Sequence, residues 1–243
     1  MNTSSNPQQH RIIVLDTETT GMNTESGPHY MGHRIIEIGA VEIINRKLTG
    51  RHFHVYVKAD RPIQSEAVLV HGITDEFLVD KPEYRDVHKE FLEFIDGAEL
   101  VAHNAPFDVG FMDHEFSMLD PKIGKTEQYC KVTDTLDMAK KIFPGKRNNL
   151  DILCDRYGID NSHRTLHGAL LDAEILADVY LLMTGGQTDL KFNSGENSDG
   201  SEEIIRVASG RKALKVLRAS ADEITAHNER LDLVEKSGAC LWR

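Results

Sequence analysis

The feature that most constrains this chain is an apolar run that ends in two carboxylates. Residues 12–15 read Ile-Ile-Val-Leu and lead directly into Asp16 and Glu18. An apolar run of this kind predicts a buried strand, in which residues i and i+2 point to the same face. Two acids so close together repel each other unless a cation lies between them, and hard divalent cations prefer oxygen ligands. The sequence therefore predicts a sheet that carries a metal site at the end of one strand.

Two later segments carry residues of the same chemistry. H-N-A-P-F-D contains Asp108, and H-G-A-L-L-D contains His167 and Asp172. Each has an ordinary explanation on its own, because Asp108 could complement a helix dipole and the other two could be ordinary helix residues. Asp172, however, lies beside an apolar helix stripe, where a charged side chain needs a partner. The three segments together are far more specific than any one, and they predict a metal-dependent nuclease site.

Phosphodiester hydrolysis explains why these residue types would gather. The reaction needs a water turned into hydroxide, neutralisation of charge on the phosphate and stabilisation of the leaving oxygen. Two divalent ions roughly 3.5–4 Å apart supply all three, and acidic side chains would hold them. His167, near the N-terminus of a helix, would stay neutral because the helix dipole disfavours an imidazolium. It could therefore take the proton of the attacking water.

The hydrophobic pattern predicts three strands followed by alternating helices and strands. The first strands are expected to form an antiparallel meander over residues 11–16, 34–44 and 50–57. The later elements are helices over 83–96, 106–119, 134–142, 149–157 and 168–183, with strands over 99–103 and 127–133. This order is typical of an α/β domain with a mixed sheet and helices on its faces.

A change of composition after residue 186 divides the chain. Residues 193–201 contain no apolar residue, which is typical of a flexible linker. Apolar residues return after residue 201, and Ser220 with Glu223 predicts the start of a helix. Some forty residues are nevertheless too few to form a stable core alone. We therefore expect a nuclease domain over 1–186, a linker over 187–201 and a small helical C-terminal tail over 202–243 that binds a partner.

Charge and cysteine content narrow the setting in which the chain works. The net charge of −11 argues against tight autonomous binding of nucleic acid, because phosphate contacts usually need a Lys/Arg surface. We therefore expect a partner to deliver any nucleic-acid substrate. The three cysteines are widely spaced, no apolar run is long enough to span a membrane, and residues 1–10 lack a signal core. These features predict a cytoplasmic protein with reduced thiols.

Three motifs in this chain resemble those of a known group of nucleases. D-T-E-T-T-G, H-N-A-P-F-D and H-G-A-L-L-D, in this order, resemble the exonuclease motifs of the DnaQ-like DEDDh group over residues 11–183. The stretches V-H-G-I-T-D-E-F-L and F-P-G-K-R-N-N-L-D and the terminal C-L-W-R are similar to the proofreading subunits of bacterial DNA polymerase III. The resemblance implies a ribonuclease H-like fold and a 3′-to-5′ exonuclease that removes mispaired nucleotides as 5′-monophosphates.

The same resemblance implies a role for each residue of the predicted site. Asp16 would bridge two divalent cations, Mg²⁺ or Mn²⁺, and Glu18 and Asp172 would complete the first ion's site. Asp108 would hold the second ion, partly through water. His167 would be the general base. All five are therefore catalytic candidates, and no motif residue departs from the pattern of the group.

Substrate contacts are implied for three further residues. Glu66 and His71 match positions that contact the terminal nucleotide in this group, beside the metal ligands Asp16, Glu18 and Asp172. Phe107 is a candidate for packing against the terminal bases. The alternatives are a surface loop ahead of a helix capped by Thr74, for Glu66 and His71, and a core role for Phe107.

The end of the chain carries candidate partner sites. The run Gln187–Phe192 resembles a sliding-clamp-binding peptide, with Gln187, Leu190 and Phe192 as its anchors, although helix packing is the alternative. The tail would bind the catalytic alpha subunit of the polymerase, and a small theta subunit is a candidate partner of the exonuclease domain. The substrate would be a single-stranded or frayed DNA 3′ end.

Two other functions remain open at this point. A free-standing 3′-to-5′ exonuclease could use the same site on RNA ends, but it would have no need of the tail. A non-catalytic scaffold between polymerase and clamp would have no use for a charged cluster that is costly to assemble.

Overall fold

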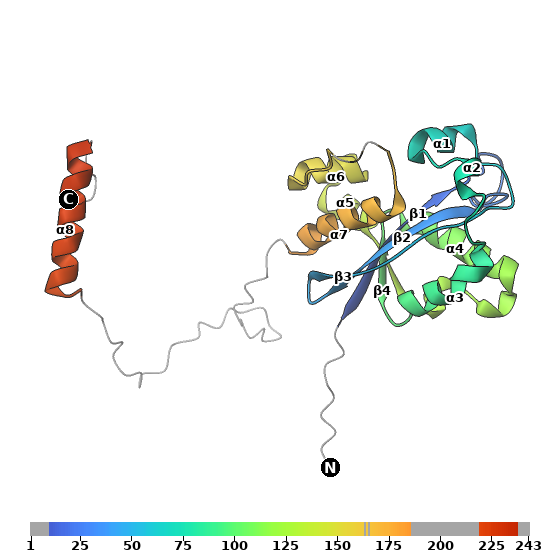
Figure 1. Ribbon diagram of the computed structural model, residues 1–243, viewed down its shortest axis with the longest axis horizontal. Coiled ribbons are helices and arrows are strands. Elements are labelled where there is room, and N and C mark those ends of the chain that lie inside the picture. The colour runs from blue at the N-terminus through green and yellow to red at the C-terminus, as the bar shows by residue number, and fades with distance from the viewer. Residues whose placement is uncertain (1–9, 163, 165, 186–218, 238–243) are drawn as a thin grey trace, which may run out of the picture. The chain divides into compact units, whose positions relative to one another are not determined.

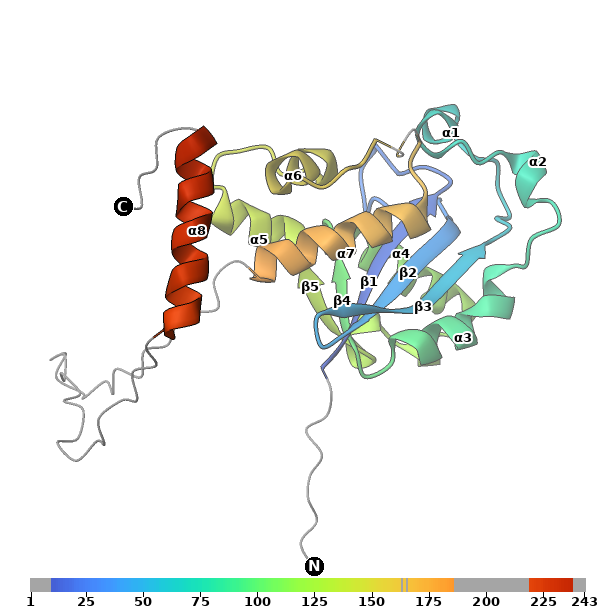
Figure 2. The same cartoon turned by 60° about the vertical axis from the view of Figure 1, so that its left-hand side comes forward.

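The computed structural model describes residues 10–162, 164, 166–185 and 219–237. The chain divides into two compact units, over residues 1–188 and 189–243. The first unit contains a five-stranded sheet with helices on both faces (Figures 1 and 2). The expected α/β fold with a mixed sheet is confirmed.

The sheet joins an antiparallel meander to two parallel strands. Its strands are β1 (Arg11–Thr19), β2 (Ile35–Ile44), β3 (Lys47–Tyr56), β4 (Glu99–Ala102) and β5 (Lys131–Asp134). Their order across the sheet is β3-β2-β1-β4-β5. β1 pairs with β2 antiparallel and with β4 parallel, so β1 lies at the centre. Because β1 and β4 are parallel, their carboxyl ends lie at the same edge of the sheet. The predicted acidic residues are carried at or after these strand ends.

The helices of the first unit connect and cover these strands. They are α1 (Ser65–His71), α2 (Asp75–Leu78), α3 (Tyr84–Ile95), α4 (Ala105–Leu119), α5 (Thr135–Ile142), α6 (Leu150–Tyr157) and α7 (Ala169–Gly185), with short 3-10 turns at Pro121–Ile123 and Thr126–Gln128. Helices α3 and α4 pack on one face of the sheet, and α7 lies across the other with α6 beside it (Figure 2).

The alternation of β1 sorts its side chains between two cores. Ile13 and Leu15 belong to the core under α3 and α4, whereas Ile12 and Val14 belong to the core under α7. Continuing the same alternation places both predicted acids on the α7 face. This period of two is the reason why one strand can deliver two carboxylates to one site.

A glycine on β2 lets α7 come close to the sheet at that point. Gly39 is the cross-strand partner of Asp16. A Cβ added at Gly39 would lie only 2.1 Å from the backbone nitrogen of Leu170. The missing side chain therefore allows the first turn of α7 to rest directly on the strand, next to the predicted metal ligand.

Two segments differ from the pattern-based prediction. Residues 65–71 form helix α1. A surface loop was the expectation for this segment if it had no binding role. The helix ends at Gly72, which adopts the left-handed conformation (φ 72°). The fifth strand begins at residue 131 rather than 127. The preceding residues form a 3-10 turn instead, because the Asp113 carboxylate accepts hydrogen bonds from the backbone and hydroxyl of Thr126, both at 2.7 Å.

The described part of the second unit is one helix, α8 (Ala221–Ser237). The Ser220 N–H donates to the Glu223 carboxylate at 2.7 Å, and the Glu223 N–H donates to the Ser220 hydroxyl at 3.3 Å. This reciprocal pair confirms the capping box. None of the helices in the described ranges has the length and apolar character that a membrane span requires.

Candidate metal-dependent active site

The end of β1 supplies the first two carboxylates. Glu18 is buried and faces Glu37 directly across the β1–β2 ladder. Asp16, two residues earlier, is partly buried. Both side chains leave the strand on the α7 face, so the first part of the predicted site has the geometry that the sequence pattern required.

A tight turn after β4 brings the third carboxylate to the same place. Asn104 takes up the left-handed conformation (φ 67°), and its N–H donates to Asp134 at 2.9 Å. The chain then enters α4, whose first turn carries the buried Asp108. The Thr17 hydroxyl donates to Asp108 Oδ1 at 2.7 Å, which ties the helix to β1.

The start of α7 supplies the last two predicted residues. Asp172 is buried in its first turn, and His167 precedes the helix with its N–H donating to the Val70 carbonyl at 3.1 Å. Ligand atoms of Glu18, His167 and Asp172 all lie within 4.8 Å of one another. Segments far apart in the sequence therefore meet at one edge of the sheet.

The structure also places a cation in this cluster that the sequence analysis did not single out. The Arg164 guanidinium donates to both carboxylate oxygens of Asp172, at 2.5 and 2.7 Å. It also donates to Asp151 at 2.8 Å and to His167 Nδ1 at 2.8 Å. A basic residue three positions before the histidine was the available signal. The partner that Asp172 needed is therefore Arg164.

Three of the carboxyl groups retain their protons unusually well. Burial, followed by the charges of Asp108 and Glu18, holds the pKa of Asp16 well above its ordinary range. Burial and then the charges of Asp172 and Glu37 raise the pKa of Glu18 to about 8. Burial raises the pKa of Asp108 to about 7. The cluster therefore contains too little positive charge to keep these carboxyl groups ionised.

Asp172 behaves in the opposite way. Burial alone would raise its pKa, but the hydrogen bonds from Arg164 and the positive charge of that guanidinium more than offset burial, and the pKa of Asp172 lies below its ordinary value. A buried carboxylate that stays charged, beside others that need a cation to lose their protons, suits hard divalent ions. The donor set of this site therefore fits divalent metal ions.

The raised pKa values predict how stability depends on pH without metal. Ordinary carboxyl pKa values lie near 4, so between roughly pH 4.5 and 8 these carboxyl groups bind more protons in the folded chain than in the unfolded chain. Glu18 contributes stability below its unfolded pKa, and this stability is lost as the pH rises through about 8. Urea unfolding in EDTA should therefore show a lower free energy of unfolding at pH 8 than at pH 5.

Two controls make this measurement specific to the site. Glu18→Gln should flatten the dependence on pH, and Mg²⁺ at pH 8 should restore stability to the parent chain. A free energy of unfolding that rises from pH 5 to pH 8 in EDTA, and is unaffected by Glu18→Gln, would contradict the account.

A cleft of about 600 Å³ opens beside the carboxylates. Its lining includes Glu18, Glu66, His71 and Phe107. The two α1 residues and the aromatic ring therefore gather next to a predicted metal ligand. Phe107 also packs against the core under α3 and α4, as the alternative role for this ring predicted.

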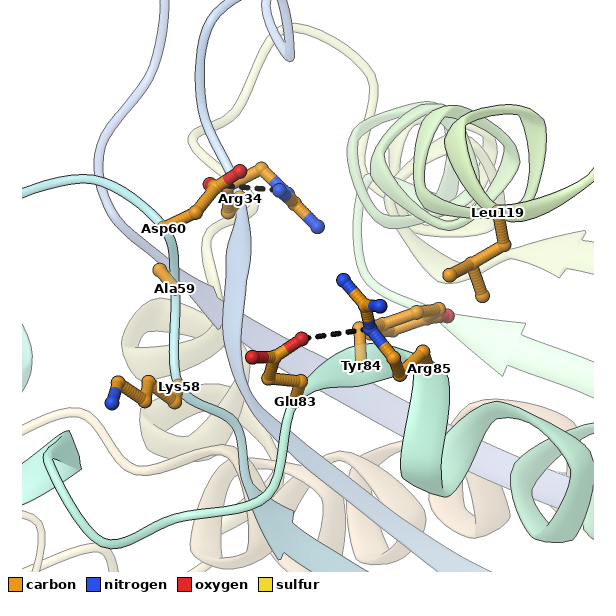
Figure 3. A pocket seen from close by; sticks show the side chains of 8 residues that line it. All are labelled: Arg34, Lys58, Ala59, Asp60, Glu83, Tyr84, Arg85 and Leu119. Atoms are coloured by element: carbon orange, nitrogen blue, oxygen red, sulfur yellow. Dashed lines mark ion pairs between the residues drawn. The ribbon is translucent and has the colours of Figure 1, made fainter.

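A second pocket, of about 180 Å³, shares no lining residue with this cleft (Figure 3). Four of its charged side chains form two ion pairs: Arg34 lies 2.7 Å from Asp60, and Arg85 lies 2.7 Å from Glu83. The pocket therefore lacks the gathering of unpaired carboxylates that marks the first site.

The anchors of the clamp-binding run, Gln187, Leu190 and Phe192, lie outside the described residues. The structure describes all five catalytic candidates and the three additional substrate-contact candidates. The five catalytic candidates converge at one edge of the sheet. Of these, Glu18 lines the adjacent cleft, together with Glu66, His71 and Phe107.

Solved structures share this arrangement of the fold. Exonuclease X in complex with 5′ overhanging duplex DNA matches with a TM-score of 0.54 and 26% identity, over 72% of this chain and 90% of that chain. The nuclease domain of 3′hExo, a DEDDh family member bound to rAMP, matches with a TM-score of 0.57 over 74% of this chain and 94% of that chain. The latter is 18% identical, so it supports the fold alone.

Sequence comparison identifies much nearer relatives. Residues 13–180 match the model of the Exonuclease family. DNA polymerase III subunit epsilon of Salmonella typhimurium is 61% identical over 96% of this chain and 97% of that protein. The Escherichia coli subunit is 60% identical over the same shares, and that of Haemophilus influenzae is 58% identical over 96% and 94%. This chain therefore belongs to the exonuclease family and, within it, to the epsilon subunits of bacterial DNA polymerase III.

Proposed function

We propose that this chain is the proofreading 3′-to-5′ exonuclease subunit of a bacterial replicative DNA polymerase and works by two-metal hydrolysis. The observation that carries the proposal is the convergence of four carboxylates and His167 beside one cleft. The high identity to epsilon subunits supports the assignment. The alternatives of an RNA-end exonuclease and a non-catalytic scaffold gain no support from these relatives.

The four carboxylates divide the work of holding two divalent ions, Mg²⁺ or Mn²⁺. Asp16 interacts electrostatically with each of the other three carboxylates and would bridge the ions. Glu18 and Asp172 would complete one ion's site, and Asp108, held by the Thr17 hydroxyl, would serve the other. The bound ions would lower the pKa of the attacking water and neutralise charge on the phosphate. His167 would accept the water's proton at the edge of the cluster.

His71, which lines the cleft, is the hydrogen-bond donor that we propose for the terminal nucleotide. The Ile73 N–H donates to His71 Nδ1 at 3.0 Å, so a neutral ring carries its proton on Nε2. Burial lowers the pKa of His71, and the Thr19 carbonyl offsets only part of that shift. Nε2 is buried without a hydrogen-bond partner of normal geometry in the described residues. We infer that this N–H, with Glu66 and the Phe107 ring, orients the 3′ nucleotide.

Hydrolysis of labelled ends tests the proposed function. The purified chain with Mg²⁺ should release mononucleotides from 3′-labelled single-stranded DNA, faster than from RNA of the same sequence, and EDTA should stop the reaction. A matched His71→Ala variant should raise KM for DNA more than it lowers kcat. If neither the DNA nor the RNA releases mononucleotides in a metal-dependent way, the proposal is contradicted.

The tail is proposed to attach the nuclease to the alpha subunit. In α8, Ile224 is 51% exposed and Leu233 is 57% exposed, which leaves apolar surface available for a partner. The acidic net charge supports the same division of labour, because a polymerase would deliver the DNA end. A theta subunit is proposed as a further partner of the first unit.

Separating the two parts tests this attachment. Residues 1–186 should fold and digest single-stranded DNA but should not co-purify with the alpha subunit. The 202–243 peptide should gain helical circular dichroism when alpha is added, as expected of coupled folding and binding. Stable binding of alpha by residues 1–186 alone would overturn the assignment of the tail.

The run at 187–192 is proposed to bind the sliding clamp. A short peptide binds weakly, but tethering within a polymerase assembly raises its effective concentration to about the millimolar range. Replacing Leu190 and Phe192 together with alanine should weaken the assembly of clamp, polymerase and this subunit in gel filtration. Hydrolysis of free single-stranded DNA should not change. If the double variant assembles as tightly as the parent, the run is only linker.

A further inference from the structure

The side chain of Arg164 is buried within the carboxylate cluster, unlike that of an arginine on the protein surface. Its side chain is only 7% exposed, and its guanidinium grips both oxygens of Asp172 as a fork. Asp172 in turn raises the pKa of Arg164. A buried charged pair joined by two hydrogen bonds is among the stronger polar contacts in proteins. The Arg164–Asp172 contact therefore holds both side chains in one arrangement.

The guanidinium stands where the charge of a metal ion is needed. It lies against Asp172, a proposed metal ligand, and 2.8 Å from His167 Nδ1. Both oxygens of Asp172 already accept from Arg164. A divalent ion on that carboxylate would use the same oxygens and would repel the guanidinium. Arg164 and the metal therefore compete for Asp172.

A second carboxylate provides Arg164 with another partner. Asp151, at the first turn of α6, accepts from Arg164 Nη1 at 2.8 Å and from Asn161 Nδ2 at 3.2 Å. Its side chain is 52% exposed, whereas that of Asp172 is 3% exposed. An arginine that released Asp172 would therefore keep one ion pair at the rim, and the segment that carries His167 would remain tethered to α6.

The same guanidinium sets the proton position on His167. Nη2 lies 2.8 Å from His167 Nδ1, and a guanidinium can only donate, so Nδ1 accepts and the neutral ring carries its proton on Nε2. Asp172 Oδ2 lies 3.3 Å from Nδ1 and is the alternative partner. If Arg164 moves away, Nδ1 can carry the proton and donate a hydrogen bond to the Asp172 carboxylate. Nε2 then has a free lone pair and can accept a proton.

We propose that Arg164 is an exchangeable counter-cation and positioning residue of the active site. It occupies Asp172 when the site holds no metal, and it shifts to Asp151 when divalent ions bind. The exchange replaces one positive charge with another, so the buried carboxylate is never left unpaired. It also changes His167 from the ring form that carries a proton on Nε2 to the form that can accept one there. This inference rests on the proposed role of Asp172 as a metal ligand.

Calorimetric titration of the full chain with Mn²⁺ tests the competition. Arg164→Ala removes the competitor and should tighten Mn²⁺ binding about tenfold or more. Asp151→Asn removes the alternative partner, so it should weaken Mn²⁺ binding severalfold. The Asp151→Asn effect should disappear in the Arg164→Ala background, because Asp151 acts only through the arginine.

Controls separate this exchange from simple changes in net charge. Arg147→Ala and Asp155→Asn alter the charge equally at exposed positions near α6 and should leave Mn²⁺ affinity nearly unchanged. Arg164→Lys keeps the charge without the fork, and it should fold and bind Mn²⁺ with intermediate affinity. Additive effects of the two site substitutions, or an Arg164→Ala variant that binds no more tightly than the parent, would overturn the proposal.

Nitrogen NMR of His167 supplies a second readout that does not depend on activity. The parent without metal should show the proton on Nε2, and saturation with Mg²⁺ should move it to Nδ1. Arg164→Ala should lack the metal-free Nε2–H form. An unchanged ring form on adding Mg²⁺ would contradict the exchange. If the parent chain binds no Mn²⁺ at all, the proposed function fails instead, so the two failures are distinguishable.

Discussion

Each of the three variants Asp16→Ala, Glu18→Ala and Asp172→Ala should nearly abolish the release of nucleotides from DNA 3′ ends. Each carboxylate is proposed to hold a metal ion that generates the hydroxide and neutralises the phosphate, and a missing ligand removes both effects together. The measurement is the rate of mononucleotide release with saturating Mg²⁺. Asp137→Ala, which removes an exposed carboxylate elsewhere on the chain, is the matched control and should keep the parent rate.

The three variants should differ in stability although they agree in activity. The pKa values of Asp16 and Glu18 are raised, so each charged form is destabilised in the metal-free fold. Their alanine variants should therefore be at least as stable as the parent in EDTA at pH 8. Asp172 has a lowered pKa and pairs with Arg164, so its loss should destabilise the fold. Near-parent hydrolysis by all three variants would end the two-metal account.

His167→Ala should lower the rate of hydrolysis by roughly 10²–10⁴-fold while leaving Mn²⁺ affinity much less affected than Asp16→Ala does. A general base removes the proton of the attacking water, and without one the reaction depends on the metal-bound water alone. At saturating Mg²⁺, the loss of activity at acidic pH should largely disappear in the variant, because an imidazolium can no longer form at this position.

Added imidazole provides a direct check on the same residue. It should restore part of the rate to His167→Ala but not to Asp16→Ala, because a free base can replace a proton acceptor and not a metal ligand. An unchanged pH–rate profile in His167→Ala, together with no rescue, would show that the metal alone activates the water.

The strand-borne half of the site could be predicted because it depends on local geometry. A period of two places Asp16 and Glu18 on the face of Ile12 and Val14, and the two cores of the sheet confirm that division. The apolar stripe of α7 likewise indicated that Asp172 needed a partner. In each case the information lies within one element of secondary structure.

The rest could not be predicted because it depends on contacts between elements. Arg164 precedes α7 in an irregular segment, and its two acidic partners belong to different helices, so no periodic pattern marks it. Gly39 is an ordinary strand residue until α7 is seen to rest against it. The α1 helix was missed because its exposed Leu69 and Val70 break the apolar pattern of a short helix.

The most direct measurement of the central claim is the anomalous scattering of Mn²⁺ in crystals grown with a nucleoside 5′-monophosphate. We expect two peaks roughly 3.5–4 Å apart, both in contact with Asp16, one completed by Glu18 and Asp172 and the other facing Asp108. The phosphate should lie between them and the sugar in the cleft lined by His71. A single peak, or peaks that do not contact Asp16, would contradict the two-metal site.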